Sequence, residues 1–371
     1  MHLLFNMKKA LNRRTFIKGL TAASALIPVI SVAQSSSIYD GKKIKVALVG
    51  LGRYAEYMAS QMKNCQFCEV AGLVSGSPDK LESWGKMYNV PTKNRYNYEN
   101  FDKIKDNPDI DLVYIILPNA MHKEYTIRAA KAKKHVLVEK PMAINAADCL
   151  EMIKVCKDNK VQLAMGYRLH FEPYNMEMMR LGQKQIFGKV RVVEASLGYF
   201  AGEKGEWRLN KKLAGGGPLM NLGVYCVQAG RYITGEEPIA VTAQFGPVLR
   251  KELFTEVEES ITWQMEFPSG AVCTSTSTLA AGIDRLYASA ENGHFELSPA
   301  ISYGPFKGRT RESEMDFPQI NQQAAQMDAI SKVILENKPM PDHISGLEGW
   351  KDMKVLDAIY KAAETGKKVM I

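Results

Sequence analysis

Asn221 and Tyr225 stand four positions apart in LAGGGPLMNLGVY (213–225), a segment that opens with three glycines and a proline. At that spacing both side chains would share one face of a helix. Lys140 belongs to a second short pattern, Glu139-Lys140-Pro141, directly after an apolar run. A free tyrosine, with a pKa of about 10, is a poor base near neutrality, but a neighbouring ammonium favours the phenolate. A tyrosine and a lysine brought together could therefore act as a general acid/base and its electrostatic partner, the alternative being a core tyrosine and a capping lysine.

Gly50 and Gly52 begin the pattern GLGRYA, which follows an apolar run and precedes a helical pattern. Glycines at these positions allow a tight turn and let backbone N–H groups approach a pyrophosphate at the helix N-terminus. We predict a dinucleotide site that also includes Arg53 and Tyr54.

The residues after the next apolar run indicate which dinucleotide is bound. NAD-binding sites place Asp or Glu there, to accept hydrogen bonds from the ribose hydroxyls. This chain has LVSGS (73–77) instead. Ser75, Lys80 and Arg53 could surround a 2′-phosphate, so NADP(H) is the predicted cofactor and NAD(H) the alternative.

Five apolar runs separated by helical patterns must position these residues. Such a series predicts a doubly wound parallel sheet with helices on both faces. Lys140 ends one of the strands, and ligands bind beyond the carboxyl ends of the strands in such sheets. The predicted strands are 43–50, 69–76, 111–118, 135–141 and 162–167.

The pattern changes near Gly166. Longer alternating strands at 190–200, 261–267 and 271–279 predict an α+β domain with an open, mostly antiparallel sheet, and two helical patterns close the chain. The predicted fold class is thus α/β, with a Rossmann domain over 34–165 and a substrate-binding and oligomerisation domain over 166–371.

The first 33 residues explain the net charge of +8. They contain five basic residues and no acidic one, which leaves 43 basic and 40 acidic residues in the rest, so a nucleic-acid partner is not implied. Arg13-Arg14, a short apolar stretch and Ser31-Val32-Ala33 predict a twin-arginine signal peptide over 1–33, folded export and a periplasmic protein that leaves the membrane after cleavage.

The six cysteines indicate little chemistry. Cys65 and Cys68 form a single CxxC without a second pair, so no metal site is predicted, although a local disulfide is an alternative. Cys149 and Cys156 are expected to pack in a core.

Seven stretches, in this order and spacing, resemble the glucose–fructose oxidoreductase / inositol dehydrogenase / MocA (Gfo/Idh/MocA) family over residues 43 to 371, and most of all its periplasmic glucose–fructose oxidoreductase branch. They are GLGRYA, LVSGSPDK, YIILPNAMH, VEKPMA, GYRLHFEPYN, EWRLNKKLAGGGPLMNLGVY and RYITGEEP. The resemblance implies a Rossmann domain, an open-sheet domain that closes over the cofactor, and a catalytic segment at 213–225. In that segment Tyr225 matches the tyrosine of the glucose–fructose branch, so we predict that Tyr225 is the general acid/base and Lys140 its electrostatic partner.

The resemblance also implies roles for further residues. The expected cofactor-binding residues are Leu117, Asn119, His122, Glu139, Lys140 and Arg168, and the expected substrate-binding residues are Trp207, Arg208 and Tyr303. His170 is either part of the site or packing.

The chain departs from the family pattern at Asn221, where an acidic residue is usual. Asn can still donate and accept hydrogen bonds but carries no charge, so we expect turnover to be retained but reduced. A second departure is the short stretch between the predicted cleavage site and the first strand, where the periplasmic relatives have a long arm that helps to hold NADP.

The resemblance implies an NADP-dependent sugar oxidoreductase in which tightly bound NADP(H) takes hydride from one sugar and gives it to another, and a homodimer or homotetramer formed through the open sheet. Three alternatives stay open: a glycoside hydrolase that uses transient oxidation, a dehydrogenase that forms keto-sugars, and a catalytically weak sugar sensor.

Overall fold

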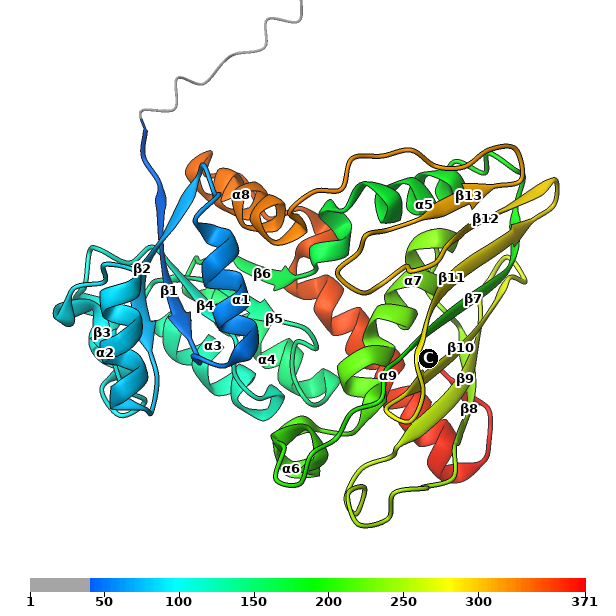
Figure 1. The fold of residues 1–371 in the computed structure, drawn as a ribbon, viewed down its shortest axis with the longest axis horizontal. Coiled ribbons are helices and arrows are strands. Elements are labelled where there is room, and N and C mark those ends of the chain that lie inside the picture. Colours follow the sequence, from blue (N-terminus) through cyan, green and yellow to red (C-terminus); the bar gives the residue numbers. More distant parts are fainter. Residues whose placement is uncertain (1–40) are drawn as a thin grey trace, which may run out of the picture. The chain divides into compact units, whose positions relative to one another are not determined.

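The computed structural model describes residues 41–371 (Figure 1), so the predicted signal peptide lies outside the described residues. A six-stranded parallel sheet has the order β3-β2-β1-β4-β5-β6. Its strands are β1 Ile44–Val49, β2 Cys68–Val74, β3 Arg95–Tyr96, β4 Leu112–Ile115, β5 His135–Glu139 and β6 Leu163–Gly166. This confirms the predicted Rossmann sheet, and adds β3, which at two residues is too short to give a pattern.

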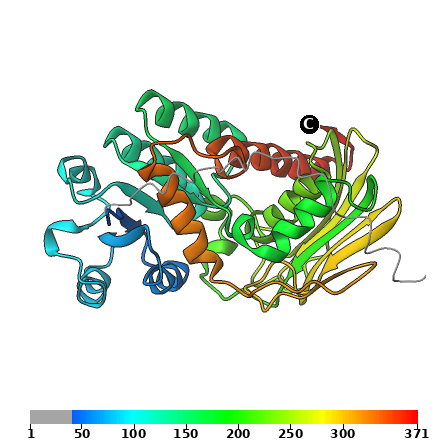
Figure 2. The same cartoon turned by 90° about the horizontal axis from the view of Figure 1, so that it is seen from above.

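Helices cover both faces of this sheet (Figure 2). They begin where the sequence places helix-starting residues: Ser77 accepts a hydrogen bond from Lys80 N before one helix, and Asn145 from Asp148 N before another. The helices are α1 Arg53–Met62, α2 Pro78–Met87, α3 His122–Lys131 and α4 Ala146–Asp158, with short 3-10 helices at Thr92–Asn94, Phe101–Asp106 and Asn119–Met121.

The second sheet has eight strands in the order β13-β12-β11-β7-β10-β9-β8-β14. Only β7 and β10 pair in parallel, and the other neighbours are antiparallel. The predicted open, mostly antiparallel sheet is therefore confirmed. Its strands are β7 Val190–Gly198, β8 Ala240–Phe245, β9 Ser260–Glu266, β10 Val272–Thr278, β11 Ile283–Ala290, β12 Gly293–Leu297, β13 Gly308–Thr310 and β14 Val369–Met370.

One face of the second sheet carries helices (Figure 2). Helix α7 packs against β7 and β10, and α9 packs against β8. Along β9, Ile261, Trp263 and Met265 are buried, whereas the residues between them are more exposed, as expected for a strand with one covered face. The helices of this part are α5 Pro173–Gln183, α6 Lys211–Ala214, α7 Val224–Thr234 and α9 Gly346–Thr365, with 3-10 helices at Arg168–Phe171, Trp207–Leu209 and Asp342–Ile344.

Helix α8 (Gln322–Leu335) returns to the first sheet, where it packs against α1, β1 and β2. Asn321, which caps this helix, also donates from Nδ2 to Gln61 Oε1 at 2.6 Å. The predicted domain boundary near residue 166 stays a prediction, but a segment from its C-terminal side covers part of the Rossmann sheet. Within residues 41–371, no helix combines the length and apolar character needed to cross a bilayer.

Candidate active site

The two glycines of GLGRYA have different reasons to be glycine. Gly50 has φ +94°, and a Cβ there would lie 2.6 Å from the Ile116 carbonyl oxygen, so the fold itself requires it. Gly52 has φ −92°, and a Cβ on it would meet nothing within 4 Å. It precedes α1, and no side chain caps that helix. Open space beside an uncapped helix N-terminus fits a pyrophosphate, so the residues present fit a dinucleotide.

The end of β2 is neutral to basic, as predicted. Ser75 is buried, and its hydroxyl accepts a hydrogen bond from Ser77 N. Lys80 Nζ donates to the Leu51 carbonyl at 2.9 Å and so fastens the glycine loop to α2. Arg53 is exposed and has no hydrogen-bond or ionic partner among the described residues. A 2′-phosphate would thus meet a serine and two cations.

Three residues expected to bind the cofactor hold the loop after β4 in place, and their contact with a cofactor stays a prediction. Leu117 is buried and lies against Gly50. Asn119 Nδ2 donates to the Ala214 carbonyl at 2.8 Å, at the end of α6. His122 is fully buried, with Nδ1 3.0 Å from the Pro141 carbonyl and Nε2 2.9 Å from that of Leu117. Both ring nitrogens of His122 therefore face backbone, which leaves no polar atom of this side chain for a ligand.

Glu139, the last residue of β5, and Lys140, which follows it, have side chains in different environments. The Glu139 carboxylate is buried and accepts a hydrogen bond from Tyr114 Oη at 2.5 Å. Burial raises the pKa of this carboxyl, against the effects of the Tyr114 hydrogen bond and the Lys140 charge. The absence of a side chain at Gly166 leaves room for this carboxylate, because a Cβ at residue 166 would lie 2.5 Å from Glu139 Oε1. Glu139 thus lies beneath the site.

Lys140 contacts both residues of interest in the predicted catalytic segment, Asn221 and Tyr225. Its Nζ donates to the backbone carbonyl of Asn221 at 2.7 Å and lies 4.4 Å from the centroid of the Tyr225 ring. The structure therefore brings Lys140 and Tyr225 together. The lysine is bound by the backbone at 221, so its position does not depend on an acidic side chain there.

The segment around Asn221 is not a regular α-helix, contrary to the expected spacing. Leu219–Gly223 forms a π-helical turn, and α7 starts only at Val224. Such turns are rare and are frequent at functional sites. The Asn221 side chain is directed to Tyr199, donating from Nδ2 to the hydroxyl at 3.1 Å, whereas Tyr225 is buried against Lys140.

Two of the three glycines before this turn, Gly216 and Gly217, are explained by two residues that the sequence reasoning missed, Glu258 and Tyr360. The Glu258 carboxylate accepts hydrogen bonds from Gly217 N (3.0 Å), Leu219 N (3.1 Å) and the Tyr360 hydroxyl (2.9 Å). A Cβ on Gly216 would lie 1.9 Å from Tyr360 Oη, and one on Gly217 2.3 Å from the Glu258 carbonyl oxygen. The glycines thus permit the close packing that positions the π-helical turn.

A second cation lies beside Tyr225. The Arg168 guanidinium is buried, with Cζ 5.1 Å from the Tyr225 ring and 4.6 Å from the ring of Tyr303. It is held by the Gln322 side chain and by the carbonyls of Ile301 and Ser302. Two cationic side chains, those of Arg168 and Lys140, therefore lie close to the Tyr225 ring.

Tyr54 belongs to the same cluster as Arg168 and Tyr225. Burial raises its pKa well above the ordinary value, Glu139 and the neighbouring tyrosines add to the rise, and Arg168 opposes it. Tyr54 therefore stays a neutral phenol, able to donate a hydrogen bond.

Two other expected substrate residues lie apart from this cluster. Arg208 stacks on Trp207, with Cζ 4.5 Å from the ring, and pairs with Glu206. Within residues 41–371, no hydrogen bond or ring contact joins either of them to Lys140 or Tyr225. Tyr199 was missed, because it directly follows a strand and no motif marks it. Exposed Tyr199 and Phe200 provide aromatic surface on the Asn221 side of the site.

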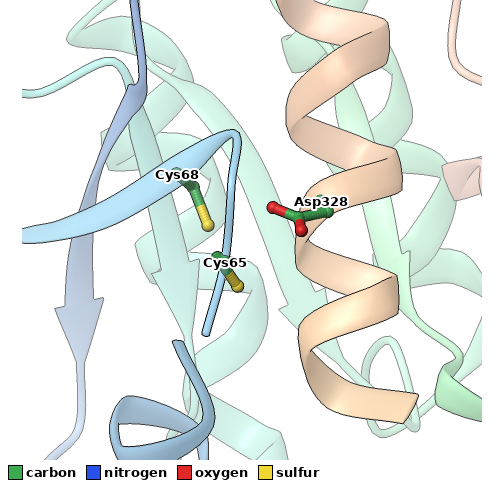
Figure 3. Close-up of side chains that lie close together, drawn as sticks. All are labelled: Cys65, Cys68 and Asp328. Atoms are coloured by element: carbon green, nitrogen blue, oxygen red, sulfur yellow. The ribbon is translucent and has the colours of Figure 1, made fainter. Parts of the chain in front are cut away.

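Cys65, Cys68 and Asp328 lie together at the start of β2 (Figure 3), their ligand atoms within 4.8 Å of one another. The Asp328 carboxylate accepts hydrogen bonds from Gln66 N and Phe67 N, so it caps the CxxC loop. Both cysteines are buried free thiols. Three donors, one of them used by the loop, do not complete a structural zinc site. Cys149 and Cys156 pack in the core as predicted.

Comparison with known proteins supports the assignment of a Rossmann domain and a second sheet domain. Residues 44–167 match the family described as "Oxidoreductase family, NAD-binding Rossmann fold", and residues 176–296 match the "GFO/IDH/MocA C-terminal domain". The crystal structure of an aldose-aldose oxidoreductase from Caulobacter crescentus is similar, with a TM-score of 0.86 and 41% identity over 89% of this chain and 100% of that chain.

Two curated relatives are more distant. The D-xylose 1-dehydrogenase [NADP(+)] of Haloarcula marismortui is 26% identical over 343 residues, covering 88% of this chain and 93% of the relative. The 2,7-anhydro-N-acetylneuraminate hydratase of Escherichia coli is 29% identical over 187 residues, or 48% of each chain. Together with the glycine loop and the Lys140–Tyr225 pair, these matches show that the chain belongs to the Gfo/Idh/MocA family of NAD(P)-dependent oxidoreductases.

Proposed function

We propose that this protein is an aldose oxidoreductase that oxidises one aldose to its lactone and reduces a second aldose, using the same tightly held NADP(H). The observation that carries the proposal is the placement of Lys140 and Arg168 beside the Tyr225 ring, with Lys140 directly after β5, in the sheet whose strand β1 leads into the glycine loop. The similarity to an aldose-aldose oxidoreductase at 41% identity supports this choice of substrates and reaction.

When bound, NADP⁺ accepts a hydride and NADPH donates one. Gly50, Gly52, Ser75, Lys80 and Arg53 would hold the dinucleotide.

Tyr225 would take the proton of the hydroxyl group on the anomeric carbon of the first aldose. The hydrogen on that carbon would leave as hydride, which NADP⁺ accepts, and the aldose would become the lactone. Tyr225 would then return that proton to the carbonyl oxygen of the second aldose, giving the alditol. Atoms and electrons balance over the two half-reactions, and Tyr225 ends in its starting state.

The remaining groups orient and stabilise these steps. Lys140 is held by the Asn221 carbonyl, so its remaining N–H bonds can point to the reacting oxygen. The Asn221 amide and the Tyr199 hydroxyl form a neutral hydrogen-bonding pair suited to sugar hydroxyls. The uncharged pair at this position is consistent with neutral aldoses as substrates.

The test uses the protein purified without added nucleotide and a panel of aldoses. We expect a nicotinamide absorbance band that comes with the protein, rises with one aldose and falls when a second is added, with lactone and alditol formed in equal amounts. A strict need for added NADP⁺ would indicate an ordinary dehydrogenase. Release of free sugar without net redox change would indicate a hydrolase, and no binding of nucleotide or turnover would indicate a sensor.

We also propose folded export to the periplasm, which agrees with a retained cofactor, because NADP has no evident supply in that compartment. The support is the Arg13-Arg14 pair followed by an apolar stretch. Replacing both arginines with lysine should leave the protein in the cytoplasm. Export of this variant at the wild-type rate would contradict the proposal.

For the assembly, we propose a homodimer or homotetramer through the outer face of the second sheet. That face includes exposed apolar residues such as Val192 and Ile283. Light scattering should give a mass at least twice that of the chain, and Val192→Lys should lower it. A monomer at micromolar concentration would contradict this.

A further inference from the structure

Two partly exposed tyrosines from distant parts of the sequence touch each other. Tyr57 lies on α1, and Tyr303 lies in the segment between β12 and β13. Their ring centroids are 5.3 Å apart at an interplanar angle of 61°, an edge-to-face contact. The side chains are 38% and 55% exposed, so this contact can open without disturbing the core.

The segment that carries Tyr303 is firmly fixed to the second sheet. The Asp284 carboxylate accepts hydrogen bonds from three successive backbone N–H groups, those of Ala300 (2.9 Å), Ile301 (2.7 Å) and Ser302 (3.0 Å). Asn175 Nδ2 donates to the Ala300 carbonyl at 3.0 Å. Tyr303 is therefore presented at a defined place.

The other partner belongs to the helix that begins at the glycine loop. Tyr57 follows Tyr54 by three residues, so both lie on neighbouring positions of one face of α1. Tyr54 reaches the cluster around Tyr225, and Arg168 stacks on both Tyr225 and Tyr303. The Tyr57–Tyr303 contact thus links helix α1, which follows the glycine loop, to the cluster around Tyr225. Both rings are partly open to solvent.

We propose that Tyr57 and Tyr303 form a clasp that slows the release of NADP(H). The inference rests on the proposed retention of the cofactor. A dinucleotide bound at Gly52 and reaching Tyr225 would extend between the two parts of the chain that this contact joins, so we expect its release to be slower while the two rings are in contact.

An edge-to-face aromatic pair corresponds to about a three- to tenfold change in a rate that depends on breaking it. Tyr57→Ala and Tyr303→Ala should each speed cofactor release by about this factor. The double variant should be no faster than either single variant, because both remove the same contact. Tyr57→Phe and Tyr303→Phe keep the rings and should release the cofactor at the wild-type rate.

The experiment loads each full-length variant with NADPH and mixes it with an excess of an unrelated NADPH-oxidising enzyme and its substrate. The loss of nicotinamide absorbance then reports release, independently of turnover by this protein. Circular dichroism and a thermal melt check that each variant is folded.

Wild-type release from Tyr57→Ala, or a double variant whose effect is the product of the two singles, would overturn the clasp. Either result leaves the proposed function standing if the protein still binds NADPH and cycles two aldoses. Failure of the wild-type protein to bind NADPH would instead contradict the proposed function.

Discussion

At the residue scale, the proposed chemistry depends on one phenol with two cations beside it. The sequence motif identifies Lys140, and family resemblance identifies Tyr225, but Arg168 was expected only to face the cofactor. Its place beside Tyr225 results from long-range contacts to Gln322 and Ser302, which no local pattern encodes. For Asn221, the sequence drew attention to the side chain, but it is the backbone carbonyl of this residue that accepts the hydrogen bond from Lys140.

Tyr225→Phe should lower kcat by about 10²- to 10⁴-fold, the usual contribution of a positioned acid/base group. The ring and its contacts with Lys140 and Arg168 are kept, so NADPH binding, measured by fluorescence titration, should be unchanged. Tyr199→Phe is the matched control: it loses one hydroxyl and its bond to Asn221, and kcat should fall by less than about tenfold. Near wild-type kcat in Tyr225→Phe would show that another group moves the proton.

At the element scale, alternating apolar runs predict the Rossmann sheet well because its strands are buried on both faces. The second sheet was predicted only in part, since short strands such as β13 and β14 are defined by their neighbours. The π-helical turn could not be predicted from spacing, because Glu258 and Tyr360, which position it, come from distant parts of the sequence.

Gly217→Ala tests this support. The added Cβ would lie 2.3 Å from the Glu258 carbonyl oxygen, so the segment around Gly217 or the residues just before β9 must shift. Overpacking of this kind costs about 1–3 kcal/mol, measured by urea unfolding, and kcat should fall because the carbonyl of Asn221 no longer positions Lys140. Gly282→Ala is the control, because a Cβ there meets nothing within 4 Å, and it should change neither quantity. Unaltered kcat in Gly217→Ala would show that the packing of Gly217 against Glu258 is not needed for catalysis.

At the scale of the whole molecule, His170 lies where three elements meet, which favours the packing interpretation left open by the sequence. Its ring lies 4.2 Å from that of Tyr232 on α7, 5.5 Å from His343 and 5.6 Å from Tyr167. Burial lowers the pKa of His170 to about 3, with the charges of His343 and Arg231 adding to the effect. The imidazole is therefore neutral in the folded protein.

This burial makes stability depend on pH below neutrality. Between pH 6.5, the ordinary pKa of histidine, and pH 3, the unfolded chain binds a proton that the folded protein excludes, so stability falls as the pH falls. From pH 7 to pH 5 the loss is about 2 kcal/mol for this group. His170→Phe keeps a ring at the junction and removes the titration, so its free energy of unfolding should fall by about 2 kcal/mol less over that interval. Other buried histidines, such as His122, remain in both proteins, and the difference between them isolates residue 170. An equal pH dependence of urea unfolding in the two proteins would show that His170 is protonated in the folded state, and that the junction opens to water.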